Sequence, residues 1–382
     1  MAEYNDFNDE QNEMSRTMGL DLTLTAQEGD TSIQSSEKKG RIEYIDAMRG
    51  LTMLLVVYWH VAVLYVEDNY LWSVMPTDWT FNTIFLEFRM PLFFFVSGFV
   101  LYKASRVWTG KEILNFFKKK TPIQLIFPMI CLETFLLTVN SSTSFVGALF
   151  LGAKFGYWFT FVLLEFYVFY IALKLLPLKG KAEDIGQWVI SALLMFTLQY
   201  CALLDPYFPN EGGLIGLLSV PEWQYFFFFI FGVQVRKHFT TFEELLDNGW
   251  FIIICLLGFI GINITSIPRL WLNVLGGIFG VVLVFAFFRH YRESFTKEKR
   301  LGRIMQYVGK RTLDVYLIHY FFIYANCNTG AVLRHFVEGQ PLLELLCFGS
   351  IAVVIVALSL VASNVLRLSP FVAHYFFGAK KK

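Results

Sequence analysis

Long apolar stretches recur along the chain from about residue 47, and each is close to the ~20 residues that a helix needs to cross a bilayer. Pro221 interrupts the sixth stretch, and a tight turn containing Ser266, Pro268 and Arg269 joins the seventh to the eighth. The pattern therefore predicts an all-α, polytopic transmembrane helix bundle with about ten spans. The predicted spans are 47–66, 82–102, 121–139, 157–175, 186–204, 214–235, 250–267, 270–288, 311–327 and 342–366.

The distribution of Lys and Arg predicts the orientation of these spans, because cytoplasmic segments carry an excess of both residues. Of the 32 Lys and Arg residues, 27 lie in the segments that share one side with the two chain ends. The segments of the other side hold only Lys154, Arg269 and Arg334. The remaining two, Arg49 and Arg89, lie within spans. Both termini are therefore expected to be cytoplasmic.

Residues 1–40 differ in composition from the rest of the chain. This segment is polar and has no sustained apolar period, so we predict a disordered tail. It also lacks the early apolar core of a signal peptide. Residues 41–370 are predicted to form one membrane domain, followed by a short basic cytoplasmic tail over 371–382.

Composition excludes several classes of function. The chain is 55% hydrophobic and only 16% charged, whereas soluble domains carry about 25% charged residues, so no separate soluble domain is expected. A net charge of +1 gives no reason to expect a nucleic-acid partner. The five cysteines show neither CxxC nor metal-ligand spacing, so we predict no metal site and no disulfide framework.

Ionisable residues inside the predicted spans are the candidates for function, because a charged side chain in hydrocarbon is costly. In the first span, Arg49 and His60 are eleven residues apart and share one helix face, about 16 Å from each other along the axis. Asp46 precedes Arg49 by three residues and can pair with it across one turn. From geometry alone, function and packing remain equally good explanations of His60.

Four further spans contribute polar residues. In the second, Arg89 lies at a depth comparable to His60, Glu87 lies on another face, and Pro91 is expected to kink the helix. Ser97 and Gly98 allow close helix packing. Glu133 and Glu165 lie near the middle of the third and fourth spans, and either could pair with Arg89. In the ninth, Asp314 and His319 are five residues apart and so lie on different faces, where His319 could satisfy a backbone carbonyl.

A histidine, an arginine and a carboxylate at mid-membrane suit two functions. In acyl transfer, the histidine is the general base for an acceptor hydroxyl, and the arginine stabilises developing negative charge. In a secondary transporter, the same groups relay protons. A third possibility is a membrane scaffold whose buried charges only hold helices together.

The first two spans resemble the acyltransferase-3 family of membrane O-acyltransferases. YIDAMRGLTMLLVVYWH matches the family pattern of an arginine, ten residues and a histidine, with Asp46 as the preceding acidic residue. FRMPLFFFVSGFVLY is similar to the family's second helix, and its RMPLFFFVSGF variant looks closest to the glucan succinyltransferase-like subgroup. Weaker matches follow in YWFTFVLLEFY, EWQYFFFFIFGVQVRK and TLDVYLIH, so the resemblance covers about 45–370.

The resemblance implies an enzyme that transfers an acetyl or succinyl group from cytoplasmic acyl-CoA to a carbohydrate hydroxyl. It implies no bound cofactor, a carbohydrate or glycan acceptor, and a multi-pass location in the cell membrane, the inner membrane of a bacterium. O-acetylation of a cell-envelope polysaccharide is the simplest such reaction. A transporter or exporter of a modified glycan remains the alternative. The sequence predicts neither the acceptor nor the oligomeric state.

The family pattern assigns roles to His60, Arg49 and Arg89, and the positions of the other polar residues suggest the rest. The predicted catalytic residues are His60, Arg89 and Glu165. The predicted donor-binding residues are Arg49, Lys118, Lys119 and Lys120, and the predicted supporting residues are Asp46, Ser97, Asp314 and His319. Many family members have arginines after the second helix, where this chain has the three lysines and Gln124 before Pro128. Lysine attracts phosphate but lacks the bidentate fork of arginine, so it could equally be a charge anchor at the membrane surface.

Overall fold

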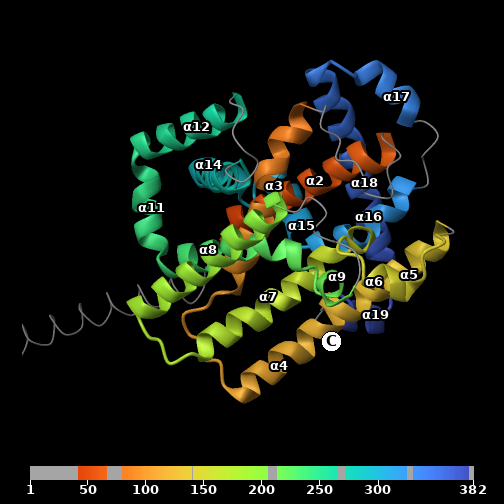
Figure 1. Cartoon of the computed structure of the whole chain (residues 1–382). Helices are drawn as coiled ribbons and strands as arrows, with labels where there is room; N and C mark the ends of the chain where they lie inside the picture. Colours follow the sequence, from red (N-terminus) through yellow and green to blue (C-terminus); the bar gives the residue numbers. More distant parts are fainter. Residues whose placement is uncertain are drawn as a thin grey trace, which may run out of the picture. The chain divides into compact units, whose positions relative to one another are not determined.

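The computed structural model describes residues 42–66, 80–139, 141–204, 213–264, 272–324 and 330–377. The predicted tail over 1–40 and the predicted turn at 266–269 lie outside the described residues. Contacts divide the chain into Met1–Glu43 and Tyr44–Lys382, and all that follows concerns the second unit. Its described residues form helices and no strand, which confirms the predicted all-α fold (Figure 1).

Every predicted span coincides with helical structure in the described residues. The helices at these positions are α2 (Glu43–His60) with a π-helical turn (Val61–Val66), α3 (Thr80–Leu101), α4 (Gly110–Thr121) with a π turn (Pro122–Ile126) and α5 (Phe127–Thr138), α7 (Trp158–Leu175), α8 (Lys181–Leu204), α10 (Phe226–Lys237), α12 (Gly249–Ile264), α14 (Gly277–His290), α16 (Thr312–Tyr324) and α18 (Pro341–Leu366). The shorter helices are α6 (Phe145–Leu149), α9 (Gly213–Leu217), α11 (Phe239–Asp247), α15 (Arg300–Gly309), α17 (Gly330–Val337) and α19 (Pro370–Tyr375).

Length and composition alone qualify four described helices as membrane spans: Phe81–Leu101, Gly110–Thr138, Trp158–Leu175 and Pro341–Leu366. A fifth is added if α11 and α12, which meet at 82°, are counted as one broken span. α14 and α16 are apolar but shorter. The helices thus form a membrane bundle, and the count of ten and the cytoplasmic orientation remain predictions from the sequence.

Two polar segments between the predicted spans, 103–120 and 236–249, are largely helical. Most of 103–120 forms α4, which begins at the cap of Thr109 on the Glu112 N–H and continues into the third span. No Gly or Pro interrupts 111–121, so nothing ends the helix at the membrane surface. Likewise, the segment 236–249 contains α11, which is held to α14 by ion pairs from Arg289 to Glu243 and Asp247.

The two prolines that were expected to disturb spans have different effects. The sixth span breaks as predicted: a 3₁₀ turn (Val220–Tyr225) that contains Pro221 separates α9 from α10. By contrast, α3 continues through Pro91 as one helix. Pro221 lies at the start of its turn, where a missing N–H costs little. The kink expected at Pro91 stays a prediction.

α3 packs most closely against α10, through two glycines. A Cβ added at Gly98 would lie 1.9 Å from the Phe229 carbonyl oxygen, and one added at Gly232 would lie 1.9 Å from the Phe95 carbonyl oxygen. The predicted packing role of Gly98 is therefore confirmed. The close approach fixes α3, which carries Phe93, Val96 and Ser97 to the cavity described below.

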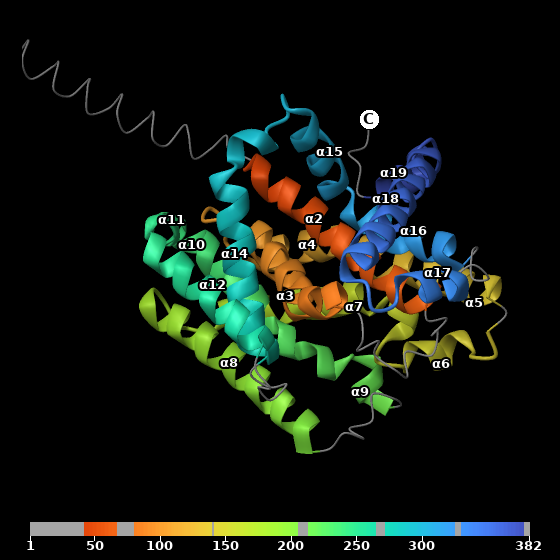
Figure 2. The same ribbon diagram turned by 90° about the horizontal axis from the view of Figure 1, so that it is seen from above.

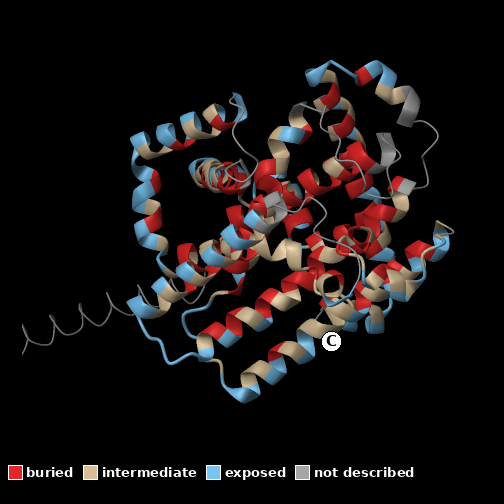
Figure 3. Ribbon diagram, in the orientation of Figure 1, coloured by how far each residue is buried: buried red, intermediate tan, exposed pale blue. Residues whose placement is uncertain are grey.

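Figure 3 shows buried residues gathered on the inner helices, such as α2 and α16, and exposed residues along α11 and α12. Large apolar side chains are exposed on α18 as well, including Val353, Val354 and Val361. Such surfaces would promote aggregation in water, but they match the hydrocarbon of a bilayer.

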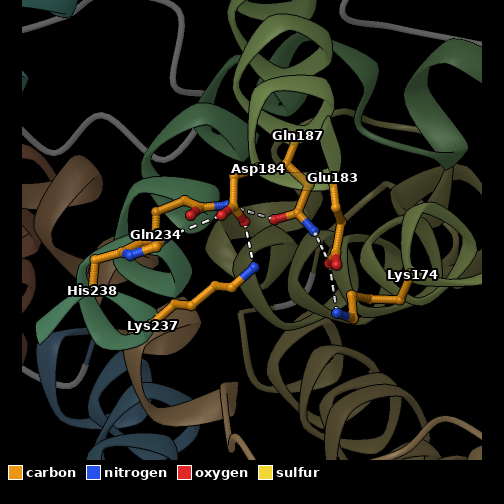
Figure 4. A network of polar contacts seen from close by, with 7 residues as sticks. All are labelled: Lys174, Glu183, Asp184, Gln187, Gln234, Lys237 and His238. Atoms are coloured by element: carbon orange, nitrogen blue, oxygen red, sulfur yellow. Dashed lines mark hydrogen bonds and ion pairs between the residues drawn. The ribbon is translucent and has the colours of Figure 1, made fainter. Parts of the chain in front are cut away.

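A polar network joins α7, α8 and α10 at the predicted cytoplasmic side (Figure 4). It consists of Lys174, Glu183, Asp184, Gln187, Gln234, Lys237 and His238. Lys237 Nζ lies 2.5 Å from Asp184 Oδ1, and His238 Nε2 lies 3.1 Å from Asp184 Oδ2. Burial opposes ionisation of Asp184, but the hydrogen bonds from Lys237 and His238 outweigh it and lower the pKa of this carboxyl.

Candidate active site

His60 ends α2 at the point where the helix widens into a π turn, and it is 5% exposed. Its Nδ1 lies 3.1 Å from His319 Nε2, and its Nε2 lies 2.9 Å from the Tyr320 hydroxyl. Both partners belong to α16 (Figure 2). Arg49 near the start of α2 bonds Thr312 at the start of α16, and His60 at the end of α2 meets His319 further along α16, so the two helices run in the same general direction. A π turn is frequent at functional sites, so the local widening at His60 is consistent with a site here.

Arg89 on α3 lies close to this centre. Its guanidinium carbon is 4.9 Å from the centroid of the Trp59 ring, and that ring lies 4.8 Å from the ring of His60. Arg89 is 3% exposed, and its Nη1 has no hydrogen-bond partner among the described residues. A buried, incompletely paired guanidinium is costly, so this group is available to a negatively charged or polar substrate atom.

The two mid-span carboxylates do not pair with Arg89 in the described structure. Glu165 accepts a hydrogen bond of 2.7 Å from Trp223 Nε1 instead. Glu133 is only half-buried. The carboxylate of Glu87 is buried and accepts a 3.1 Å hydrogen bond from Asn263 Nδ2. Of the predicted catalytic trio, His60 and Arg89 thus lie close together, whereas the printed hydrogen-bond partner of Glu165 is Trp223.

A cavity of about 460 Å³ opens beside the first half of α2. This volume is within the range of small-molecule sites. Four cationic side chains line it: Arg49, Lys103, Arg106 and Lys120. Its other walls include Phe93, Ser97, Gln124, Phe159, Thr160 and Tyr316. The cavity therefore combines several positive charges with an apolar interior.

Tyr316 connects the cavity to the histidine pair. It lines the cavity, and its ring centroid lies 6.1 Å from that of His319 and 6.4 Å from that of Tyr320. His60 itself is not among the described residues that line the cavity. His60, His319 and Tyr320 thus lie about one turn of α16 beyond the wall that Tyr316 forms.

Of the four predicted donor-binding residues, Arg49 and Lys120 line the cavity. Arg49 also bonds Thr312 Oγ1 at 3.2 Å and lies 3.6 Å from Asp46 Oδ1, as the three-residue spacing predicted. Lys118 and Lys119 are exposed on α4 and lie outside the described cavity wall.

The remaining supporting residues have distinct places. Asp314 faces α18, where it accepts hydrogen bonds of 2.7 Å from Arg367 Nη2 and 2.5 Å from the Ser363 hydroxyl. His319 lies on the other side of α16 against His60, so the predicted separation of the two faces is confirmed. Ser97 lines the cavity and donates to the Phe93 carbonyl at 2.9 Å.

Sequence reasoning missed two kinds of site residue. Tyr320 directly follows His319, but nothing distinguishes it from the other 17 tyrosines of the chain. Lys103 and Arg106 belong to the basic segment 103–120, but only the structure selects them as cavity residues. The excess of positive charge in this segment was the available signal.

The fold and the site define an integral membrane protein with a buried polar centre beside a basic cavity. The acyltransferase domain family, acyltransferase-3, matches residues 42–362, so the chain belongs to this family and is a membrane acyltransferase. A protein of Bacillus subtilis (strain 168), YfiQ, which is named as a candidate membrane-bound acyltransferase, is 23% identical over 313 residues. This match covers 74% of the present chain and 81% of YfiQ. No solved structure matches the chain.

Proposed function

We propose that this acyltransferase takes an acetyl or succinyl group from cytoplasmic acyl-CoA and transfers it to a carbohydrate hydroxyl. The observation that carries the donor assignment is the cavity whose wall combines Arg49, Lys103, Arg106 and Lys120 with apolar residues. Cationic side chains suit the phosphates of the nucleotide, and the apolar interior suits the acyl-bearing arm. The likeness of RMPLFFFVSGF to the succinyltransferase subgroup supports succinyl as the second candidate group.

In this proposal the thioester lies at the inner end of the cavity, beside Tyr316, and His60 is the general base. His60 Nε2 takes the proton from the acceptor hydroxyl as the oxygen attacks the thioester carbonyl. A C–O bond forms, the C–S bond breaks, and the leaving thiolate receives the proton back from His60. Arg89 stabilises the negative charge that develops on the carbonyl oxygen or orients the acceptor.

The roles of the other residues follow from their positions. Arg49 and Lys120 contact donor phosphates, and Asp46 holds Arg49 in place. Lys118 and Lys119 add positive charge at the surface, where they attract the donor at longer range. Glu165, which is held by Trp223, would act only indirectly, through the shape of the acceptor side.

A transporter or exporter of a modified glycan is the competing function, since buried charges also serve proton relays. The two are separated by the fate of the thioester. We would incubate purified protein with acetyl-CoA or succinyl-CoA and crude cell glycans, and measure thioester loss and acyl-glycan formation. Consumption of either donor with matching product is expected. Glycan flux across proteoliposomes without any donor consumption would refute acyl transfer.

A further inference from the structure

A chain of hydrogen bonds runs through the two buried histidines. The Val315 carbonyl oxygen lies 2.9 Å from His319 Nδ1, and His319 Nε2 lies 3.1 Å from His60 Nδ1. The chain ends where His60 Nε2 lies 2.9 Å from the Tyr320 hydroxyl. Both ring nitrogens of both histidines are therefore engaged.

The chemistry of the first partner determines the position of every proton in the chain. The Val315 carbonyl can only accept, so His319 Nδ1 carries a proton and, in the neutral ring, His319 Nε2 accepts. His60 Nδ1 must then donate to His319, which leaves His60 Nε2 as an acceptor for the Tyr320 O–H. The backbone of Val56, one turn before His60, is a further hydrogen-bond partner of this ring and also requires an N–H.

The opposite direction of the chain would require a second proton on His319. That residue is 0% exposed, and its described partners are the backbone groups of Val315 and Tyr316, the ring of His60 and the rings of Tyr316 and Tyr320. None of these is a carboxylate. A charged imidazolium at this position would be buried without a counter-charge, which is costly.

We propose that His319 is a positioning residue that holds His60 in the tautomer with its proton on Nδ1. His60 Nε2 is thereby kept free of a proton, and it can act as a base when an acceptor hydroxyl takes the place of the Tyr320 O–H. The arrangement parallels the role of an acidic partner in hydrolase triads, with a neutral histidine anchored by a carbonyl in place of the carboxylate. This inference rests on the proposed function, in which His60 is the general base.

Two substitutions separate hydrogen bonding from packing. In His319→Gln, the side-chain amide oxygen reaches the position of Nε2 and preserves an acceptor for His60. In His319→Asn, the amide nitrogen replaces Nδ1 and no atom reaches His60. We expect kcat to fall about tenfold in His319→Asn and to stay within about threefold of wild type in His319→Gln. The scale is taken from metal-bound histidines, where loss of an orienting partner typically costs about 10–100-fold. In His319→Asn the His60 N–H still has the Val56 backbone as a partner, so the lower end of that range applies.

KM for acyl-CoA should be unchanged in both variants, because His319 lies outside the described wall of the cavity. The exposed His335 of α17 provides a matched control, since His335→Gln makes the same chemical change away from the site. Equal kcat in wild type, His319→Asn and His319→Gln would overturn the inference, provided that thermal unfolding shows all three to be folded.

The tautomer can be measured without turnover. The protein has 6 histidines, so ¹⁵N-histidine spectra in detergent can be assigned by substituting each one. We expect the His60 proton on Nδ1 in wild type, with a weaker Nδ1–H hydrogen bond in His319→Asn that is restored in His319→Gln. A wild-type His60 protonated on Nε2 would overturn the inference. Activity that survives His60→Ala would instead refute the proposed function, whatever tautomer the spectra show.

Discussion

The contact between α3 and α10 depends on the absence of a side chain at Gly98. In Gly98→Ala the new Cβ would lie 1.9 Å from the Phe229 carbonyl oxygen, whereas ordinary contact begins at 3.4 Å. Because the obstructing atom belongs to the backbone, no change of rotamer relieves the clash, and the two helices must separate by about 1.5 Å, the difference between these distances. Phe95 and Phe229, both fully buried at this contact, would lose part of their packing.

The magnitude follows from two opposing contributions. Overpacking of a dense interface costs about 1–3 kcal/mol, and a backbone clash belongs at the upper end. Replacing Gly by Ala inside a helix returns about 1 kcal/mol. We therefore expect Gly98→Ala to lower the free energy of unfolding by about 2 kcal/mol. The matched control is Gly349→Ala in α18, where an added Cβ meets nothing within 4 Å, so the helix-propensity gain stands alone.

This difference in stability can be measured by thermal unfolding in detergent, in which the reaction of a fluorogenic maleimide with cysteine reports unfolding. Cys131 and Cys255 are buried and should become reactive only on unfolding. We expect Gly98→Ala to have the lowest Tm, wild type an intermediate Tm and Gly349→Ala the highest. A Gly98→Ala protein that melts at or above the temperature of Gly349→Ala would refute the proposed close contact of the two helices.

Three further predictions concern the cavity, the polar network around Asp184 and the turn at Gly156, which lies beside Tyr320. Arg106→Gln should raise KM about 3- to 10-fold for acyl-CoA but not for an acyl-pantetheine donor without nucleotide phosphates, and equal effects on both donors would contradict phosphate binding. Asp184→Asn should cost about 1–2 kcal/mol at pH 7. Because the pKa of Asp184 is lowered in the folded protein, its ionised carboxylate contributes stability at pH values above its unfolded pKa of about 3.9. The Tm difference between wild type and Asp184→Asn should therefore disappear as the pH falls through the folded pKa. A difference that persists at low pH would contradict this. Gly156→Ala should cost about 2–5 kcal/mol and reduce turnover, because the backbone has φ of +90° and the added Cβ would lie 2.0 Å from the Tyr320 hydroxyl. Gly180→Ala, with φ of +59° and open space around it, controls for backbone strain and should keep full turnover.

The sequence predicted the helices well because membrane spans are specified by the length of apolar runs, which are local. The pairing of Asp46 with Arg49 was equally local, since it follows from one turn of helix. The helical structure of α4 and α11 was not predicted, because both lie in polar segments between the apolar runs. Polarity does not end a helix, however, and neither 111–121 nor 239–247 contains Gly or Pro.

The partners of the buried polar groups could not be predicted, because they depend on which faces of distant helices meet. His60 and His319 are 259 residues apart in sequence, and no local pattern indicates that they touch. By depth alone, Glu165 was as suitable for Arg89 as any other carboxylate, but the structure places Trp223 beside it. Lys118, Lys119 and Lys120 are consecutive and look equivalent in sequence, whereas helix geometry turns only one of them toward the cavity.

The acyl transfer proposed for His60 is tested most directly by the rate at which labelled acyl groups pass from acetyl-CoA or succinyl-CoA to glycan in proteoliposomes. Wild type, His60→Ala and the exposed-site control His335→Ala would be compared after thermal unfolding confirms that each is folded. We predict product from wild type and His335→Ala, and a loss of at least about 100-fold in His60→Ala, as expected when a general base is removed. Acylated glycan formed by folded His60→Ala at the wild-type rate would contradict the account.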